Sequence, residues 1–172
     1  MPGERNFRWV WIPLVVIAVD QVTKLAVHSL MPEEHIRVII PGFLNLVHRH
    51  NPGVAFGMLA DSESPLLTRL LLLFSTGAIC LLAWLLSTGR AGDARSRTGL
   101  ALILGGAAGN AVDRLVHSSV IDFVNFYVGR WHWPAFNVAD SCIVIGAGLV
   151  ILDLLMERPH SEKESSERSA GA

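Results

Sequence analysis

The sequence predicts an all-α polytopic membrane protein with four transmembrane helices and a small β-sheet on one surface. The chain of 172 residues is 51% hydrophobic and only 17% charged, whereas about 25% of the residues in a typical soluble domain are charged. Its apolar residues gather into four long segments, and most cations lie outside them on one predicted side. These observations exclude a soluble single domain, and the formal net charge of -1 argues against a nucleic-acid partner.

Four segments are apolar enough to cross a bilayer, whose hydrocarbon core needs about 20 residues in helical form. We expect these spans at about residues 9–28, 66–86, 98–116 and 138–156. The first follows two arginines like a secretory signal, but no small-x-small cleavage site comes after it, so we interpret it as a retained span. Residues 1–156 then form one membrane domain, and the Ser- and Glu-rich tail 157–172 is expected to be disordered.

The distribution of cations predicts the orientation of the spans. An even number of spans places both termini on one side, and that side carries eight Lys and Arg residues. The opposite side, formed by residues 29–65 and 117–137, carries three. Cytoplasmic segments of membrane proteins are enriched in Lys and Arg, so we expect cytoplasmic termini and two extracytoplasmic segments.

The first extracytoplasmic segment has the pattern of a small sheet. Residues 36–40 and 44–47 are short β-compatible runs separated by Pro41 and Gly42, and the sequence around Pro52 is typical of a turn. In the second segment, Asp122 is expected in a loop.

Polar residues of the spans converge at one depth. At about 1.5 Å of rise per residue, their positions fall near the extracytoplasmic boundary in three helices. They are Asp20 and Lys24 in the first span, Asn110, Asp113 and Arg114 in the third, and Asn137, Asp140 and Ser141 at the start of the fourth. Such residues usually face a partner or a cavity inside the bundle.

Two of these pairs have a structural as well as a functional interpretation. Asp20 and Lys24, spaced i and i+4, could form an intrahelical ion pair that ties the first span to a neighbouring helix, or could contact a substrate. For Asp113 and Arg114 we favour a structural ion pair, although Arg114 could also hold a substrate carbonyl or carboxylate.

Asp122 and Asp140 are the candidates for catalysis. Two carboxylates at one site cannot easily both ionise, so one keeps a proton and the other is a base. This is the arrangement of aspartic proteases. Motifs of zinc, serine and presenilin-type peptidases are absent, and His48 and His50 lack further ligands at metal-binding spacing, so no metal is assigned.

Five motifs in order resemble those of the lipoprotein signal peptidases, or signal peptidase II, of bacterial cytoplasmic membranes. The motifs are D-Q-V-T-K at 20–24, N-P-G-V-A-F-G at 51–57, G-G-A-A-G-N-A-V-D-R at 105–114, V-I-D-F at 120–123 and F-N-V-A-D-S at 136–141. They extend from the first span to the fourth, and their order makes the resemblance specific.

The resemblance implies an enzyme that cuts prolipoproteins on the amino side of a diacylglyceryl-modified cysteine. It implies Asp122 and Asp140 as the catalytic aspartates, an extracytoplasmic sheet that cradles the substrate, and a short helical lid. Residues expected to shape the site or bind substrate are Asp20, Lys24, Asn51, Gly53, Asn110, Arg114, Asn137 and Ala139. The expected partners are prolipoproteins, membrane lipids and the peptide antibiotic globomycin; we expect a monomer in the inner membrane, without cofactor or metal.

Two other classes of function remain open from the residues themselves. A proton-coupled carrier would use acidic and basic residues within spans as a relay. A non-catalytic assembly factor would use the small residues at 105–109 to pack against partner helices.

Overall fold

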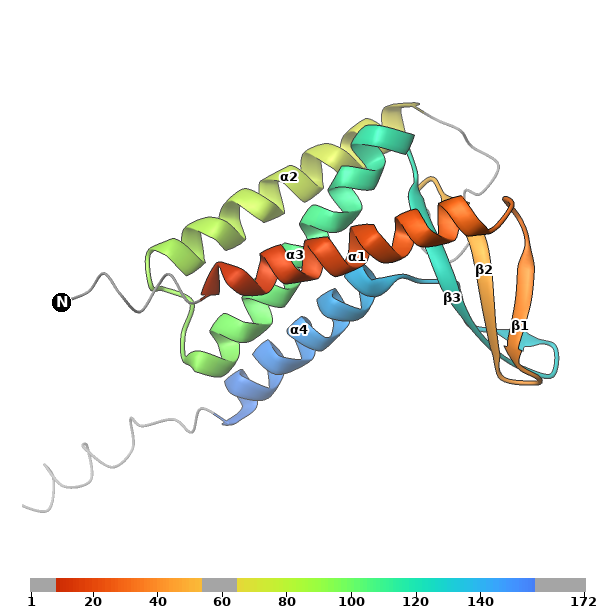
Figure 1. The fold of residues 1–172 in the computed structure, drawn as a ribbon. Coiled ribbons are helices and arrows are strands. Elements are labelled where there is room, and N and C mark those ends of the chain that lie inside the picture. The colour runs from red at the N-terminus through yellow and green to blue at the C-terminus, as the bar shows by residue number, and fades with distance from the viewer. Residues whose placement is uncertain (1–8, 54–64, 157–172) are drawn as a thin grey trace, which may run out of the picture.

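Four long helices form a bundle, and an antiparallel sheet projects from one end of it (Figure 1). The computed structural model describes residues 9–53 and 65–156. The helices are α1 (Trp11–Leu30), α2 (Pro65–Ser87), α3 (Ala94–His117) and α4 (Val138–Met156). Each is long and apolar enough to cross a membrane, which confirms the four predicted spans. The tail 157–172 lies outside the described residues, and no lid helix occurs in the described segments between the spans.

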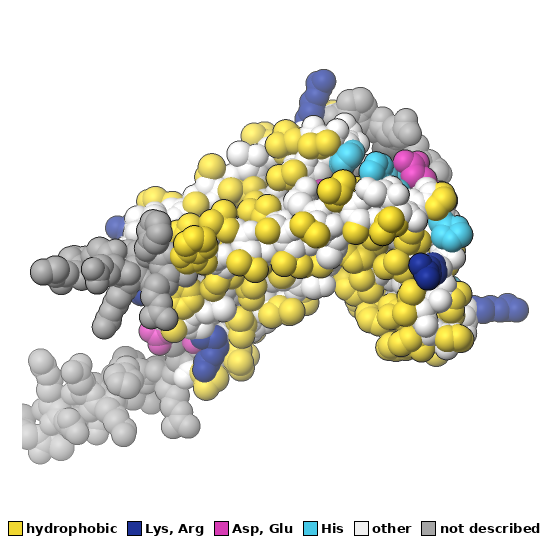
Figure 2. Space-filling view, in the orientation of Figure 1, with side chains coloured by type: hydrophobic (Ala, Val, Ile, Leu, Met, Phe, Trp, Pro, Cys, Tyr) yellow, Lys and Arg dark blue, Asp and Glu magenta, His cyan; other side chains and the backbone are white. Residues whose placement is uncertain are grey.

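The outer surface of the bundle is strongly apolar, as expected of helices that face lipid. Large side chains such as Leu73, Phe74 and Leu155 are at least 70% exposed. Figure 2 shows hydrophobic side chains over the visible face of the helices, with charged side chains mainly near the ends of the molecule. The chain is a multi-pass membrane protein on these grounds.

Small residues on α3 bring the helices close together. Helix α3 packs against each of the other three helices. A Cβ atom at Gly109 would lie 2.6 Å from Oδ2 of Asp20 on α1, and one at Gly106 would collide with the backbone oxygen of Ala139 on α4. Glycine at these positions therefore allows a backbone approach that any side chain would prevent.

The sheet has the strand order β1-β2-β3-β4, and all its pairs are antiparallel. Its strands are β1 (Ile36–Ile40), β2 (Leu44–Asn51), β3 (Val120–Val128) and β4 (Trp131–His132). The predicted strand 36–40 is confirmed, and the predicted run 44–47 extends to Asn51.

The expectation that Asp122 lies in a loop is wrong, because Asp122 lies within β3. The first four residues of this strand are all buried. Consequently the strand lacks the alternation of polar and apolar residues by which a half-exposed strand is identified in a sequence.

A small apolar core joins the sheet to the bundle. It consists of Val27 and Met31 at the end of α1 with Ile121 and Phe123 of β3. The carboxylate of Asp113 on α3 also accepts a hydrogen bond from the backbone N–H of Ile121 at 3.1 Å. These contacts fix the start of β3, and with it Asp122, against the ends of α1 and α3.

Candidate active site

Asn137 and Asp140 form a reciprocal cap at the start of α4. The side-chain oxygen of Asn137 accepts a hydrogen bond from the backbone N–H of Asp140 at 2.9 Å. In return, the Asp140 carboxylate accepts one from the backbone N–H of Asn137 at 3.3 Å. This is the geometry of a capping box, which satisfies N–H groups that have no partner inside the helix. The cap orients the Asp140 side chain.

The same asparagine holds Asp122. The side-chain nitrogen of Asn137 donates to Oδ1 of Asp122 at 2.8 Å, and the nitrogen of Asn51 on β2 donates to Oδ2 at 3.0 Å. Asn137 is fully buried and Asp122 is 3% exposed. Asn137 thus contacts both aspartates, which come from segments separated in sequence.

Asn110 on α3 connects this pair to the helices. Its side-chain nitrogen donates to Oδ1 of Asp140 at 2.8 Å, while its oxygen accepts from Lys24 Nζ at 2.9 Å and from the Asn137 side chain at 3.2 Å. The amide therefore has a defined orientation, because only its oxygen can accept from the Lys24 ammonium.

Lys24 lies between two carboxylates in the interior. Its ammonium is 2.7 Å from Oδ2 of Asp20 and 2.9 Å from Oδ2 of Asp113, and all three side chains are at most 3% exposed. The favoured Asp113–Arg114 ion pair is wrong: Asp113 pairs with Lys24, because both side chains face the α1–α3 interface. Of the two interpretations left open for Asp20 and Lys24, these contacts favour the intrahelical ion pair, which the contact between Lys24 and Asp113 ties to the neighbouring helix α3.

Asp20 also reaches the start of α4. Its Oδ1 accepts a hydrogen bond from the backbone N–H of Ala139 at 2.9 Å. A carboxylate at this position satisfies a free N–H of the first turn and interacts favourably with the helix dipole. Ala139 contributes its backbone N–H to the site. Its short side chain also leaves room for the close contact between α4 and α3.

Gln21 belongs to the same network but was not among the predicted site residues. Its side-chain nitrogen donates to Oδ1 of Asp113 at 2.8 Å and to the backbone oxygen of Gly109 at 3.2 Å. The signal available in the sequence was its place beside Asp20 in the first motif, since neither its spacing nor its charge distinguishes it.

Two predicted residues border the aspartates without contacting them through a hydrogen bond. Gly53 has φ +111° and its N–H donates to the side-chain oxygen of Asn51 at 3.0 Å, so it fixes the amide that holds Asp122. The Arg114 guanidinium donates to the backbone oxygen of Asn110 at 3.4 Å, and its buried Nε has no partner among the described residues. Arg114 thus has donor capacity to spare for another molecule.

Burial makes the Asp122 carboxyl a weaker acid than an exposed aspartic acid. Loss of solvation raises the pKa of the Asp122 carboxyl from 3.8 to about 7, and the nearby charge of Asp140 acts in the same direction. The hydrogen bonds from Asn51 and Asn137 and the charge of Lys24 oppose this shift of the pKa. Asp122 can therefore hold a proton near neutral pH.

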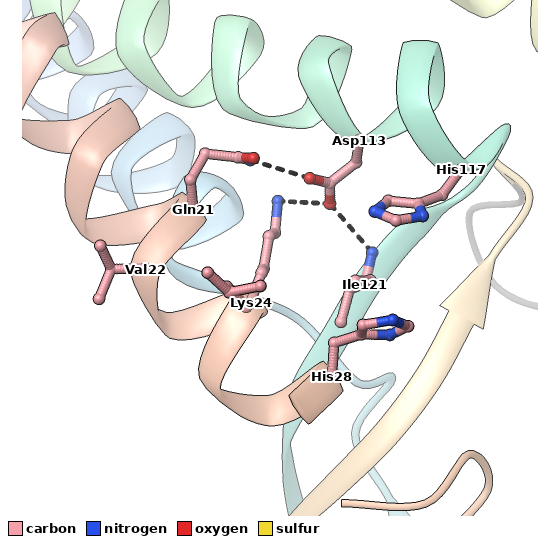
Figure 3. A pocket seen from close by; sticks show the side chains of 8 residues that line it. Gln21, Val22, Lys24, His28, Asp113, His117 and Ile121 are labelled. Carbon is pink, nitrogen blue, oxygen red and sulfur yellow. Dashed lines mark hydrogen bonds and ion pairs between the residues drawn. The ribbon is translucent and has the colours of Figure 1, made fainter. Parts of the chain in front are cut away.

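A cavity of about 280 Å³ lies beside the buried ion pair of Lys24 and Asp113. Its lining includes Gln21, Lys24, His28, Asp113 and His117. Figure 3 shows how Asp113 is held there by Gln21, Lys24 and the backbone of Ile121. Neither Asp122 nor Asp140 lines this cavity.

His48 and His50 lie on β2 next to a third histidine, His28, at the end of α1. Their rings lie with centroids 5.3 Å apart, and the His28 ring is 5.5 Å from that of His48. Burial lowers the pKa of His50. The hydrogen bonds of His48 and His50 go to Met31 and Ser119, and none in the described residues joins these histidines to Asp122 or Asp140.

Comparison with known proteins gives a consistent assignment. A family model described as signal peptidase (SPase) II matches residues 12–156. A lipoprotein signal peptidase of Solibacter usitatus is 42% identical over 155 residues, which cover 87% of this chain and 93% of that protein. One from Aeromonas hydrophila is 45% identical over 154 residues, covering 87% and 89% of the two chains.

A solved structure has the same fold. It is described as a bacterial membrane enzyme, shares 27% sequence identity, and superposes with a TM-score of 0.78 over 91% of this chain and 92% of its own. A second structure of the same description gives 28% identity and a TM-score of 0.76 over 88% and 94% of the two chains. The family model covers the bundle, the sheet and all five motifs, and with the identity of the relatives it shows that the chain belongs to the signal peptidase II family.

Proposed function

We propose that this protein is an intramembrane aspartic endopeptidase that removes the signal peptide from prolipoproteins. It cuts on the amino side of the diacylglyceryl-modified cysteine. The observation that carries the proposal is the position of Asn137, which is hydrogen-bonded to both Asp122 and Asp140. The relatives named lipoprotein signal peptidase support the choice of substrate.

In the proposed reaction, Asp122 begins protonated and Asp140 begins ionised. The raised pKa of Asp122 favours this assignment, and the Asp140 carboxylate accepts hydrogen bonds from the Asn110 side chain and the backbone N–H of Asn137. The pair is expected to titrate as a unit, so the assignment describes its dominant form.

Asp140 takes a proton from water as the water oxygen attacks the scissile carbonyl carbon. Asp122 gives its proton to the carbonyl oxygen, which forms a neutral diol. Asp122 then recovers a proton from the diol as the C–N bond breaks, and Asp140 gives its proton to the departing cysteine amine. The products are a free carboxylic acid and a free amine, and both aspartates return to their initial forms.

The surrounding residues position the substrate. Arg114, with its unpartnered buried Nε, is suited to a substrate carbonyl, while Asn51 and Gly53 at the end of β2 lie where the sheet meets the site. Lys24 orients Asn110 through a hydrogen bond to its side-chain oxygen, and Asp20 accepts a hydrogen bond from the backbone N–H of Ala139. We further propose that the sheet end of the bundle is extracytoplasmic and that both termini are cytoplasmic, in the inner membrane, as the cation distribution favours.

A diacylglyceryl chain anchored in the outer leaflet would hold the scissile bond at the depth of these aspartates. The buried polar residues of α1, α3 and the start of α4 gather near the sheet, while Asp153 with Ser96 and Arg95 forms a separate group at the other end of α3 and α4. The two groups do not form a continuous path across the bundle in the described residues. This arrangement favours a peptidase over a proton-coupled carrier.

The test uses purified protein in detergent with two forms of one precursor. We expect cleavage of the diacylglyceryl-modified form, at the amino side of its cysteine, and inhibition by globomycin. The matched unlipidated precursor should remain uncut. Failure to cut either form, with the helical fold verified by circular dichroism, would overturn the proposal, and equal cleavage of both would refute the lipid requirement.

A further inference from the structure

Three histidines gather where the end of α1 meets the sheet. His28 lies in the last turn of α1, and His48 and His50 lie two residues apart on β2, which places them on one face of the strand. One ligand nitrogen from each lies within 4.8 Å of the other two. The ring of His117, at the end of α3, is 5.6 Å from that of His28.

His48 is arranged as a metal ligand would be. Its side chain is 1% exposed, and Nδ1 lies 2.9 Å from the backbone oxygen of Met31. Because a carbonyl oxygen only accepts, Nδ1 carries the proton and Nε2 keeps a free lone pair. That Nε2 is buried and has no hydrogen-bond partner among the described residues.

His50 shows the same organisation. Its Nδ1 lies 2.9 Å from the hydroxyl of Ser119, and its Nε2, which has no hydrogen bond within the described chain, lies 3.5 Å from a carboxylate oxygen of Glu33. Histidines that bind metal commonly have their second ring nitrogen held by a backbone oxygen or another polar group, which fixes the ring. An unpaired buried nitrogen is costly, so Nε2 of His48 calls for a ligand, and Nε2 of His50 is close enough to share it.

We propose that His28, His48 and His50 bind one divalent metal ion of the zinc class. Imidazole nitrogen suits this class of metal, and a tetrahedral ion with Zn–N distances of about 2.0–2.1 Å spaces its ligands about 3.4 Å apart. The three nitrogens must therefore approach each other by up to about 1.4 Å, and the exposed His28 ring can supply most of this movement. Water completes the coordination.

The metal would connect α1 to β2 next to the proposed active site. His50 immediately precedes Asn51, whose amide holds Asp122. A bound ion would stabilise the junction of bundle and sheet without contacting either aspartate. Sequence spacing assigns no metal to His48 and His50 because the third ligand comes from α1, and only the fold brings it near.

The direct test is metal binding by the full chain in detergent after removal of metal with a chelator. Titration with Zn²⁺, measured by isothermal calorimetry, should give one bound ion per chain. Thermal unfolding in the presence of Zn²⁺ should give a higher Tm. Replacement by Co²⁺ should give the intense visible absorption of a tetrahedral site. His28→Gln and His48→Gln should each weaken binding at least tenfold.

His132→Gln is the matched control, because His132 on β4 stacks on Tyr127 away from the cluster. It should bind Zn²⁺ as the unchanged protein does. Because His28 is exposed, His28→Gln should fold and should test the proposal even if His48→Gln fails to fold. Absence of stoichiometric binding, or binding that His28→Gln leaves unchanged, would overturn the proposal and identify any bound zinc as adventitious.

Discussion

The side-chain nitrogen of Asn137 donates a hydrogen bond to Asp122 at 2.8 Å. Through its side-chain oxygen and backbone N–H, the same residue also caps the helix that carries Asp140. One buried amide thus fixes an aspartate on a strand relative to an aspartate on a helix. Two carboxyl groups must be held in a fixed relative position if one is to act as the acid and the other as the base on the same substrate.

Replacement of either aspartate by asparagine should remove activity without unfolding the protein. General acid–base catalysis contributes about 100- to 10,000-fold, so Asp122→Asn and Asp140→Asn should each lower kcat at least about 100-fold. The Asn oxygen can still accept the hydrogen bonds from Asn51 or Asn110. Cleavage assays with a lipidated precursor, together with Tm, check both expectations. Retention of a tenth of the activity in either variant would contradict the assignment.

The raised pKa of Asp122 predicts a pH-dependent stability. A folded-state pKa of about 7, against about 3.9 in the unfolded chain, means that the folded protein binds this proton more tightly. The resulting stabilisation is complete below pH about 4 and is lost as the pH rises through about 7. The Tm of the unchanged protein minus that of Asp122→Asn should therefore decrease from pH 4 to pH 8. A difference that stays constant would refute the shift.

Asn137→Ala should change both stability and the pH profile. Loss of the N-cap costs about 1 kcal/mol. Because the Asn137 hydrogen bond lowers the pKa of Asp122, its removal should move the alkaline limb of the kcat profile to higher pH. Ser141→Ala, in the same helical turn, is the control and should keep the original profile. An unshifted profile in Asn137→Ala would show that this residue acts only as a cap.

Lys24→Met should destabilise the protein strongly. The substitution leaves the buried carboxylates of Asp20 and Asp113 without their cation, and removing one partner of a buried pair costs about 3–5 kcal/mol. Glu34→Gln is the control, because Glu34 and Arg49 are 3.9 Å apart and more than half exposed. It should change stability by less than about 1 kcal/mol. Equal Tm values for the two variants would contradict this account.

Gly109→Ala should disturb the contact between α3 and α1. The added methyl group would lie 2.6 Å from the Asp20 carboxylate, and overpacking of this kind typically costs about 1–3 kcal/mol. Gly77→Ala on α2 adds the same group where nothing lies within 4 Å, so its Tm should not fall. A Gly109→Ala protein as stable as Gly77→Ala would show that the helices can separate freely at this point.

Much of the fold could be predicted because its signals are local. The four spans follow from long apolar segments, and the structure places each within a few residues of the expected boundaries. The helix start at Asn137 follows from the polar residue ahead of an apolar run. In contrast, β3 lacks alternation because its first residues are all buried, so Asp122 could not be assigned to a strand.

The sequence by itself determined that the chain has four segments apolar enough to cross a membrane and that most ionisable residues within them lie near one end, because apolar length and charge position are properties of consecutive residues. Only the tertiary structure decided which groups pair. It joins Lys24 to Asp113, sets Asn137 between Asp122 and Asp140, and adds His28 to the histidines of β2. These partners are far apart in the chain, and their contacts depend on how closely α1, α3 and α4 approach and on where the sheet meets their ends.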